Sequence, residues 1–443
     1  MSEASPAAAS SASAGRADDV TNVTGWRCAT CGQTVLVDTV WPWRCPNAIV
    51  DRHHVLRIER SMTPMRAIEH ANPFVAFDAE LAWAAFARAH GLGRDARRVM
   101  VEELDAAIAA VAGVGFTITP CFRSRRLSGA LGFSDTGGVW IKDETGNVSG
   151  SHKARHLVTI LLHLLAAERV GLTARATRPS LAIASCGNAA LAAATLAAAS
   201  DWSISVFVPP TADVAVLERL GALGASIVTC PRRVDDPPGD PCVHRFREAV
   251  AAGAIPFGVQ GPENALSLDG GRTIGFEIYE ALGHFVDRIF VQVGGGALLT
   301  GVGDGMRIGG VHPRVHAVQV AGCAPLARAH TVAATMLDPA RHWRECMWPW
   351  EDEPRSAATG ILDDETYDWI GALDAMRTGG SPIVTLEDDV VAANKLARAH
   401  TAIDADHTGT AGLAGLLTAR RSTRPDRVGD DERVVVIFSG RRR

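Results

Sequence analysis

The sequence predicts an α/β protein with mostly parallel sheets that are covered by helices on both faces. From Thr119 onward, short apolar strands alternate with helices rich in alanine and leucine, as expected of parallel strands joined by crossover helices. Glycine-rich turns join several strands to the helices that follow them, at residues 146–150, 187 and 294–296. With 443 residues, the chain is long enough for two or three domains around a large shared core.

Two segments near the start of the chain differ from this pattern. Residues 1–24 are rich in alanine and serine and are predicted to be a disordered tail. Residues 61–115 are predicted to be a helical extension with helices at 77–90 and 96–111, because apolar side chains recur there at nearly helical spacing. The α/β part of the chain is therefore expected to begin near residue 116.

Residues 25–60, between those two segments, contain a cysteine knuckle. Cys28 and Cys31 stand in a Cys-x-x-Cys-Gly sequence, and Cys45 is followed by proline, which resembles a zinc ribbon. Ala48 occupies the position where a fourth cysteine is expected, so a histidine at 53 or 54 is the candidate substitute. Three of the nine cysteines cluster here, which favours a metal site, or a degenerate relic of one, over disulfides.

The middle of the chain shows the α/β order most clearly. A predicted strand at 203–208 precedes a helix at 214–223, and a strand at 225–229 precedes a helix at 244–252. The loop between the second strand and its helix, 232–241, is rich in aspartate, proline and glycine. This order predicts parallel strands with a helix after each of them.

Lys153 is the first candidate functional residue, because a glycine-rich turn delivers it to the start of an apolar helix. The helix over 157–167 is apolar on nearly every face, so it is predicted to be buried with its start inside the protein. Burial and the positive helix end should both lower the pKa of the amine, which can then attack a carbonyl and hold it as a Schiff base. The alternative is a solvated surface lysine.

Two further turns suit the binding of anions. The predicted strand at 288–293 runs into Gly294-Gly295-Gly296-Ala297, where backbone N–H groups at a helix start would suit a phosphate. The other turn places Ser185, Gly187 and Asn188 at the carboxyl end of a strand, where open α/β sheets bind ligands. A tight turn without a ligand and an ordinary N-cap are the alternatives.

A lysine nucleophile, a phosphate cradle and a loop for a small anion together indicate an aldehyde cofactor with a phosphate, and an amino-acid substrate. At this point the chain resembles the fold-type II pyridoxal-phosphate enzymes of the tryptophan-synthase-β-like superfamily. The matching motifs, in family order, are Thr119-Pro120, Lys142-x-Glu144, Gly150-Ser151-His152-Lys153-x-Arg155, Ser185-x-Gly187-Asn188, residues 270–278, the loop at Gly294, and Val434 to Gly440. Several matches in order are far less expected by chance than any one of them.

The resemblance implies a fold and a role for each matching residue. Two open αβα domains are expected, a large cofactor-binding one over 116–156 and 263–443 and a smaller mobile one over 157–262. Lys153 would form the internal aldimine and move the α-proton, and Ser439 would meet the pyridine nitrogen. The other implied contacts are Asn188 with the cofactor's 3′-oxygen; Gly294, Gly295, Gly296 and Ala297 with its phosphate; His152 near that phosphate; and Ser185, Gly187 and Asn188 with the substrate carboxylate.

Within the superfamily the chain is most similar to threonine synthases and to threonine or serine dehydratases. A synthase eliminates phosphate from a γ-phosphorylated amino acid and adds water, whereas a dehydratase expels a β-hydroxyl and yields a keto acid and ammonia. The predicted function is a lyase that acts by elimination through a Lys153 Schiff base, synthase-like, with the dehydratase as the alternative. Lys142, Arg155 and Arg272 are candidate cations for a substrate phosphate.

Composition excludes some other classes of protein. The formal net charge of −5 and the near-average hydrophobic content give no electrostatic reason to expect nucleic acid or an anionic membrane as partner. Residues 1–24 lack the pattern of a secretory signal, so a cytoplasmic location is expected. The resemblance implies a homodimer, and a non-catalytic small-molecule-binding α/β protein is the remaining alternative. The five cysteines from Cys186 onward lack ligand spacing and are expected to be packing residues, and the tryptophan-rich segment 340–354 has no assigned role.

Overall fold

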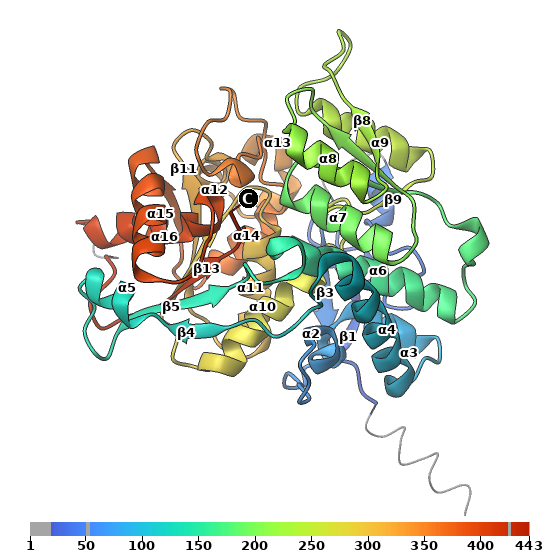
Figure 1. The fold of residues 1–443 in the computed structure, drawn as a ribbon, viewed down its shortest axis with the longest axis horizontal. Coiled ribbons are helices and arrows are strands. Elements are labelled where there is room, and N and C mark those ends of the chain that lie inside the picture. Colours follow the sequence, from blue (N-terminus) through green and yellow to red (C-terminus); the bar gives the residue numbers. More distant parts are fainter. Residues whose placement is uncertain (1–18, 50–53, 424–426, 443) are drawn as a thin grey trace, which may run out of the picture.

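The chain folds into two lobes and an N-terminal extension, as Figure 1 shows for the computed structural model. The structure describes residues 19–49, 54–423 and 427–442, so most of the tail predicted over 1–24, and position 53, lie outside the described residues. Three sheets organise the described part: one of three strands, one of six and one of four. Among the described residues, no helix is long and apolar enough to span a membrane.

The N-terminal extension combines a small antiparallel sheet with a group of helices. Its strands are β1 (Val23–Cys28), β2 (Thr34–Leu36) and β3 (Leu56–Arg60), in the order β2-β1-β3. Its helices are α2 (Pro73–Ala76), α3 (Ala82–Ala89) and α4 (Arg94–Ala112). The single helix predicted over 77–90 is wrong at its start, because a 3₁₀ turn at Asp78–Glu80 and extended Leu81 come before α3. Helix α4 ends at Gly113 in the left-handed conformation, with φ of 77°, which glycine adopts without strain.

The smaller lobe is built on the four-stranded sheet, whose strands are all parallel and lie in the order β8-β7-β6-β9. The strands are β6 (Leu181–Ala184), β7 (Ile204–Val208), β8 (Ser226–Thr229) and β9 (Ile255–Pro256). The helices of this region are α6 (Lys153–Arg169), α7 (Asn188–Ala199), α8 (Val214–Ala222) and α9 (Pro241–Ala251). Helix α9 starts where Asp240 caps the Cys242 N–H at 2.8 Å and a proline takes the first helical position.

The larger lobe is built on the six-stranded sheet, in the order β12-β11-β10-β13-β5-β4. All its neighbours are parallel except β4 and β5, so the predicted mostly parallel α/β fold is confirmed. The strands are β4 (Cys121–Arg123), β5 (Gly138–Asp143), β10 (Arg288–Gln292), β11 (Arg314–Val320), β12 (Pro382–Thr385) and β13 (Arg433–Phe438). The β10, β11 and β13 strands are almost fully buried, as expected of central parallel strands with helices on both faces.

The helices of the larger lobe lie on both faces of its sheet (Figure 1). They are α5 (Arg125–Ala130), α10 (Ser267–Leu282), α11 (Ala297–Ile308), α12 (Pro325–Ala333), α13 (Trp343–Cys346), α14 (Trp369–Met376), α15 (Glu387–His400) and α16 (His407–Arg421). Short 3₁₀ turns lie at Pro46–Ile49, Val148–Gly150, Arg175–Thr177, Pro339–Arg341 and Thr359–Ile361. The domain boundaries predicted above stay a prediction.

The tryptophan-rich segment 340–354 contributes to packing. Trp343 is buried and meets Trp369 of α14 edge to face, with ring centroids 5.4 Å apart. The guanidinium of Arg328 lies over the rings of Trp348 and Trp350, at 3.8 and 5.3 Å from their centroids. These contacts place the segment in the wall of the larger lobe.

Candidate active site

A cavity of about 330 Å³ collects the candidate residues from distant parts of the chain. Its size falls at the lower end of the range, roughly 300–1,000 Å³, of small-molecule sites. Its lining includes every residue that the resemblance assigned to the cofactor or to the substrate carboxylate: His152, Lys153, Ser185, Gly187, Asn188, Gly294, Gly295, Gly296, Ala297 and Ser439. These residues follow strands β5, β6, β10 and β13, at the carboxyl ends where open parallel sheets bind ligands.

Lys153 is the first residue of α6 and lines this cavity. Burial lowers the pKa of its amine, while the nearby carboxylates of Asp363 and Asp368 oppose the shift. The sequence contains only two other lysines, Lys142 and Lys395. Lys142 is fully buried among ion-pair partners, and Lys395 is exposed on α15. Lys153 is therefore the one lysine of the chain whose amine faces the cavity.

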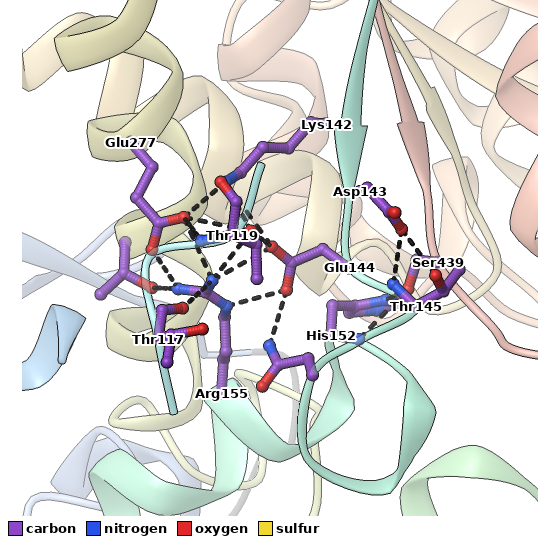
Figure 2. Close-up of polar contacts among 12 residues, drawn as sticks. Thr117, Thr119, Lys142, Asp143, Glu144, Thr145, His152, Arg155, Glu277 and Ser439 are labelled. Carbon is purple, nitrogen blue, oxygen red and sulfur yellow. Dashed lines mark hydrogen bonds and ion pairs between the residues drawn. The ribbon is translucent and has the colours of Figure 1, made fainter. Parts of the chain in front are cut away.

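Lys142 and Arg155, two of the candidate cations for a substrate phosphate, belong instead to a buried ion-pair network (Figure 2). Arg155 donates to Glu144 at 2.8 Å and to Glu277 at 2.5 Å, and Lys142 pairs with Glu277 and Thr119. Burial alone would raise the pKa of Glu144, but the charges of Arg155 and Lys142 hold it below its ordinary value. The two cations and two carboxylates neutralise each other, so neither cation is available to a ligand in the cavity.

Arg272, the third candidate cation, is also committed elsewhere. It lies inside α10 with 1% of its surface exposed and pairs with the carboxylate of Asp269. Asp304 of α11 lies 3.6 Å from its Nε. The prediction that these three cations could bind a substrate phosphate is wrong, because each of them is buried and paired with carboxylates inside the protein.

His152 and Ser439 both line the cavity and form a hydrogen-bonded pair, which Figure 2 shows. The His152 ring Nδ1 bonds the Ser439 hydroxyl, and the His152 backbone N–H donates to the same oxygen at 3.1 Å. Burial lowers the pKa of His152 well below its usual range, so the ring is neutral. Its Nε2 is buried and has no hydrogen-bond partner among the described residues. The pair thus leaves one polar ring atom for a ligand of the cavity.

The glycine turn after β10 has the form expected of a phosphate cradle. Gly296 precedes α11 in the left-handed conformation, with φ of 94°, and no side chain caps that helix. The first N–H groups of α11 therefore face the cavity side without a side-chain acceptor. Together with Lys153, this donor set fits pyridoxal phosphate, which needs an amine for its aldehyde and backbone N–H groups for its phosphate.

Three titratable residues of the cavity were not anticipated from the sequence. Asp240, Asp363 and Cys186 all belong to its lining. Cys186, which was expected to be a packing residue, is exposed, so that expectation is wrong at this position. Asp363 follows the 3₁₀ turn at Thr359–Ile361, and its only signal in the sequence is the acidic run Asp363-Asp364-Glu365.

The N-terminal knuckle brings four potential metal ligands together. Cys28, Cys31, Cys45 and His54 each offer one ligand atom, and these atoms lie within 4.8 Å of one another. The Cys31 and Cys45 Sγ atoms are 3.6 Å apart, and the Cys28 Sγ is 3.5 Å from His54 Nδ1. Tetrahedral zinc, with bonds of about 2.3 Å to sulfur and about 2.0 Å to nitrogen, holds neighbouring ligand atoms at roughly these separations. His54, rather than a fourth cysteine, completes the set.

Two threonine synthases are similar to this chain in sequence. Threonine synthase from Mycobacterium tuberculosis is 25% identical over 311 residues, which cover 68% of this chain and 75% of that protein. Threonine synthase from Bacillus sp. strain ULM1 is 24% identical over 330 residues, covering 73% and 82% of the two chains. The similarity thus extends over most of each protein.

Solved structures share the fold at lower sequence identity. Maize serine racemase superimposes with a TM-score of 0.57 at 18% identity, covering 77% of this chain and 92% of that one. The processed form of threonine deaminase isoform 2 from Solanum lycopersicum gives a TM-score of 0.56 at 19% identity, covering 79% and 85%. The family model described as "Pyridoxal-phosphate dependent enzyme" matches residues 114–440, which include every residue of the cavity named above. The chain therefore belongs to the family of pyridoxal-phosphate-dependent enzymes.

Proposed function

We propose that this protein is a lyase that acts on an amino acid by elimination, with Lys153 as the residue that carries the cofactor. The observation that supports this most directly is the position of Lys153, the single lysine at a cavity lined by two glycine turns. A binding protein without chemistry has no need of a half-buried amine whose pKa is lowered by burial. The enzyme is therefore favoured over the non-catalytic alternative.

In this proposal, different residues of the cavity bind the substrate, hold the cofactor and move the α-proton. Ser185, Gly187 and Asn188 receive the substrate carboxylate at the start of α7, and the glycine turn before α11 holds the cofactor phosphate. The cofactor, when bound, supplies the electron sink that makes the α-proton of an amino acid acidic. Lys153 Nζ then takes that proton, which requires a neutral amine, the form that its lowered pKa favours.

Two versions of this reaction remain as candidates. The curated relatives are threonine synthases, which favours elimination of phosphate followed by addition of water. The cavity favours an ammonia-lyase reaction, because its described lining contains no arginine and no lysine other than Lys153. A leaving phosphate would find no dedicated cation there. The expected homodimer and cytoplasmic location stay predictions.

A product assay separates the two versions. Purified protein with pyridoxal phosphate would receive O-phosphohomoserine, threonine or serine in parallel, and phosphate, ammonia and keto acid would be quantified. Phosphate with threonine and little ammonia is the result expected of a synthase, and ammonia with a keto acid is that expected of a dehydratase. Protein that releases none of these products from any amino acid would contradict the lyase proposal.

We also propose that the N-terminal knuckle holds one structural zinc ion through Cys28, Cys31, Cys45 and His54. Three thiolates and one imidazole form a common closed set for structural zinc, and the measured separations suit it. The ion would tie β1 to β3, and β3 carries Arg57, which pairs with Asp304 of α11 at 2.9 Å. The site would therefore help to hold the extension on the larger lobe.

Replacing Cys45 with serine is expected to remove the metal from the protein. Loss of a direct ligand should weaken zinc binding by more than the roughly 10–100-fold that loss of an outer-sphere partner costs. Metal analysis of the purified full chain is the measurement, with Cys346→Ser, a buried cysteine outside the knuckle, as the matched control. Wild-type protein that contains no stoichiometric zinc, and whose melting temperature a chelator leaves unchanged, would contradict the assignment.

A further inference from the structure

The charge of the cavity wall restricts the substrate side chain. Asp240 reaches the cavity from the start of α9, on the smaller lobe, and Asp363 reaches it from the larger lobe. The described lining contains no arginine and no lysine other than Lys153, whose nitrogen carries the chemistry. The ring of His152 is neutral. Apart from Lys153 and His152, the titratable side chains in the described wall are therefore two carboxylates and the thiol of Cys186.

Asp363 is held in place at the glycine turn. A backbone N–H of Gly295 donates to its carboxylate, and a methyl group added to Gly294 would collide with its Oδ2. Burial raises the pKa of Asp363 to about 6, so the group is largely ionised at neutral pH. The charge of Asp240 helps to raise the pKa of Asp363, both charges help to raise the pKa of the Cys186 thiol, and all three residues line the same cavity.

The cavity wall also contains a buried hydrogen-bond acceptor. Gln292, the last residue of β10, also lines the cavity and is 4% exposed. Its Oε1 is buried with no donor among the described residues. An unpartnered buried acceptor is costly unless a ligand supplies the donor, so it indicates a ligand that brings an N–H or O–H donor into the cavity.

A substrate with an anionic side chain is expected to bind poorly against this wall. A phosphate at the γ-position would meet Asp240 and Asp363 without a compensating arginine, because Arg155 and Arg272 are paired inside the protein. Like charges in a partly buried cavity repel by more than they would in water. An ammonium group, in contrast, would donate to these carboxylates in charge-assisted hydrogen bonds.

Building on the proposed function, we propose that the substrate is an amino acid whose side chain ends in an amino group, and that Asp363 selects it. Asp240 completes the acceptor set from the smaller lobe. In this proposal the substrate carboxylate binds at Ser185 and Asn188, and both aspartates line the same cavity as these two residues.

With a three-carbon diamino acid the reaction balances as an elimination of ammonia. The α-hydrogen leaves as a proton to Lys153 Nζ, and the Cβ–N bond breaks with its electron pair on the departing nitrogen. The enamine that remains takes up one water, so 2,3-diaminopropionate and water give pyruvate and two molecules of ammonia. No oxidant or reductant is required.

Two matched series of amino acids test the charge preference. The four-carbon series, homoserine, 2,4-diaminobutyrate and O-phosphohomoserine, places a neutral, a cationic and an anionic group at the same γ-position. Serine, 2,3-diaminopropionate and O-phosphoserine do the same at the β-position. The change in cofactor absorbance with each compound measures its binding to the holoenzyme, and ammonia and pyruvate are quantified in parallel. We expect the diamino acids to bind at least about tenfold tighter than their hydroxyl counterparts, as one charged hydrogen bond can provide.

Two variants test whether Asp363 causes the preference for diamino acids. In Asp363→Asn the preference for the diamino acids should shrink to about twofold or less, because the carboxylate charge is lost while the side chain keeps its size. Asp364→Asn, the same change at the neighbouring residue outside the lining, should keep it. Tighter binding of the hydroxyl or phosphorylated compounds by wild type, or an unchanged preference in Asp363→Asn, would overturn this proposal and leave the lyase intact. Absence of any absorbance change with all six compounds would instead defeat the proposed function.

Discussion

Replacing Arg155 with methionine is expected to lower the free energy of unfolding by about 3–5 kcal/mol, the usual cost of breaking a buried ion pair by removing one partner. Arg155 is fully buried and is the shared partner of Glu144 and Glu277, so its loss leaves two carboxylates facing Lys142 alone (Figure 2). Denaturant unfolding of the cofactor-free protein measures the effect. The start of α6, which carries Lys153, should loosen with it.

The same helix supplies a matched control. Arg169 lies at the end of α6 and pairs with Glu103, but both side chains are exposed, at 46% and 58%. Arg169→Met should cost no more than about 1 kcal/mol, as surface ion pairs do. The double variant Arg155→Met with Glu144→Gln should recover part of the lost stability, since Lys142 and Glu277 then balance again. Equal effects of Arg155→Met and Arg169→Met would show that the network does not stabilise the fold.

The positions of the glycine turns and of Lys153 could be predicted from the sequence, because strands, turns and helix starts are encoded by neighbouring residues. Glycine turns directly after apolar strands indicated where the carboxyl ends of β6 and β10 would lie, and parallel strands bring those ends to one edge. Lys153 could be found in the same way, as the lysine at the start of an apolar helix. For the glycine turns and Lys153, the local sequence pattern predicts the position that the residue takes in the fold.

Other features depend on contacts between distant segments and could not be read from local patterns. Glu277 pairs with Lys142, which lies 135 positions earlier, so the same lysine looked available to a ligand until its partner was known. Asp363 lies in a segment without helical or strand periodicity, and only the packing of that segment against the glycine turn brings it to the cavity. His54 lies beside the three cysteines of the knuckle because β1 and β3 pair side by side.

Replacing Lys153 with alanine is expected to abolish the covalent attachment of pyridoxal phosphate and to lower kcat by roughly 10²–10⁴-fold or more, the usual contribution of a positioned proton-transfer group. Lys153 is the lysine that faces the cavity, and its amine is made nucleophilic by burial. The measurement is reduction of the holoenzyme with borohydride, followed by mapping of the peptide that retains the cofactor, together with the absorbance spectrum.

The sequence contains only two other lysines, so only Lys142 and Lys395 could hold the cofactor in place of Lys153. Lys395→Ala is the matched control, because Lys395 is exposed on α15 and should leave both cofactor attachment and activity unchanged. Lys142 cannot attack an aldehyde while it is fully buried and paired with Glu277. Recovery of the reduced cofactor on Lys142 or Lys395 in the wild-type protein would refute the assignment, whereas its exclusive recovery on Lys153 would tie the chemistry of this chain to the start of α6.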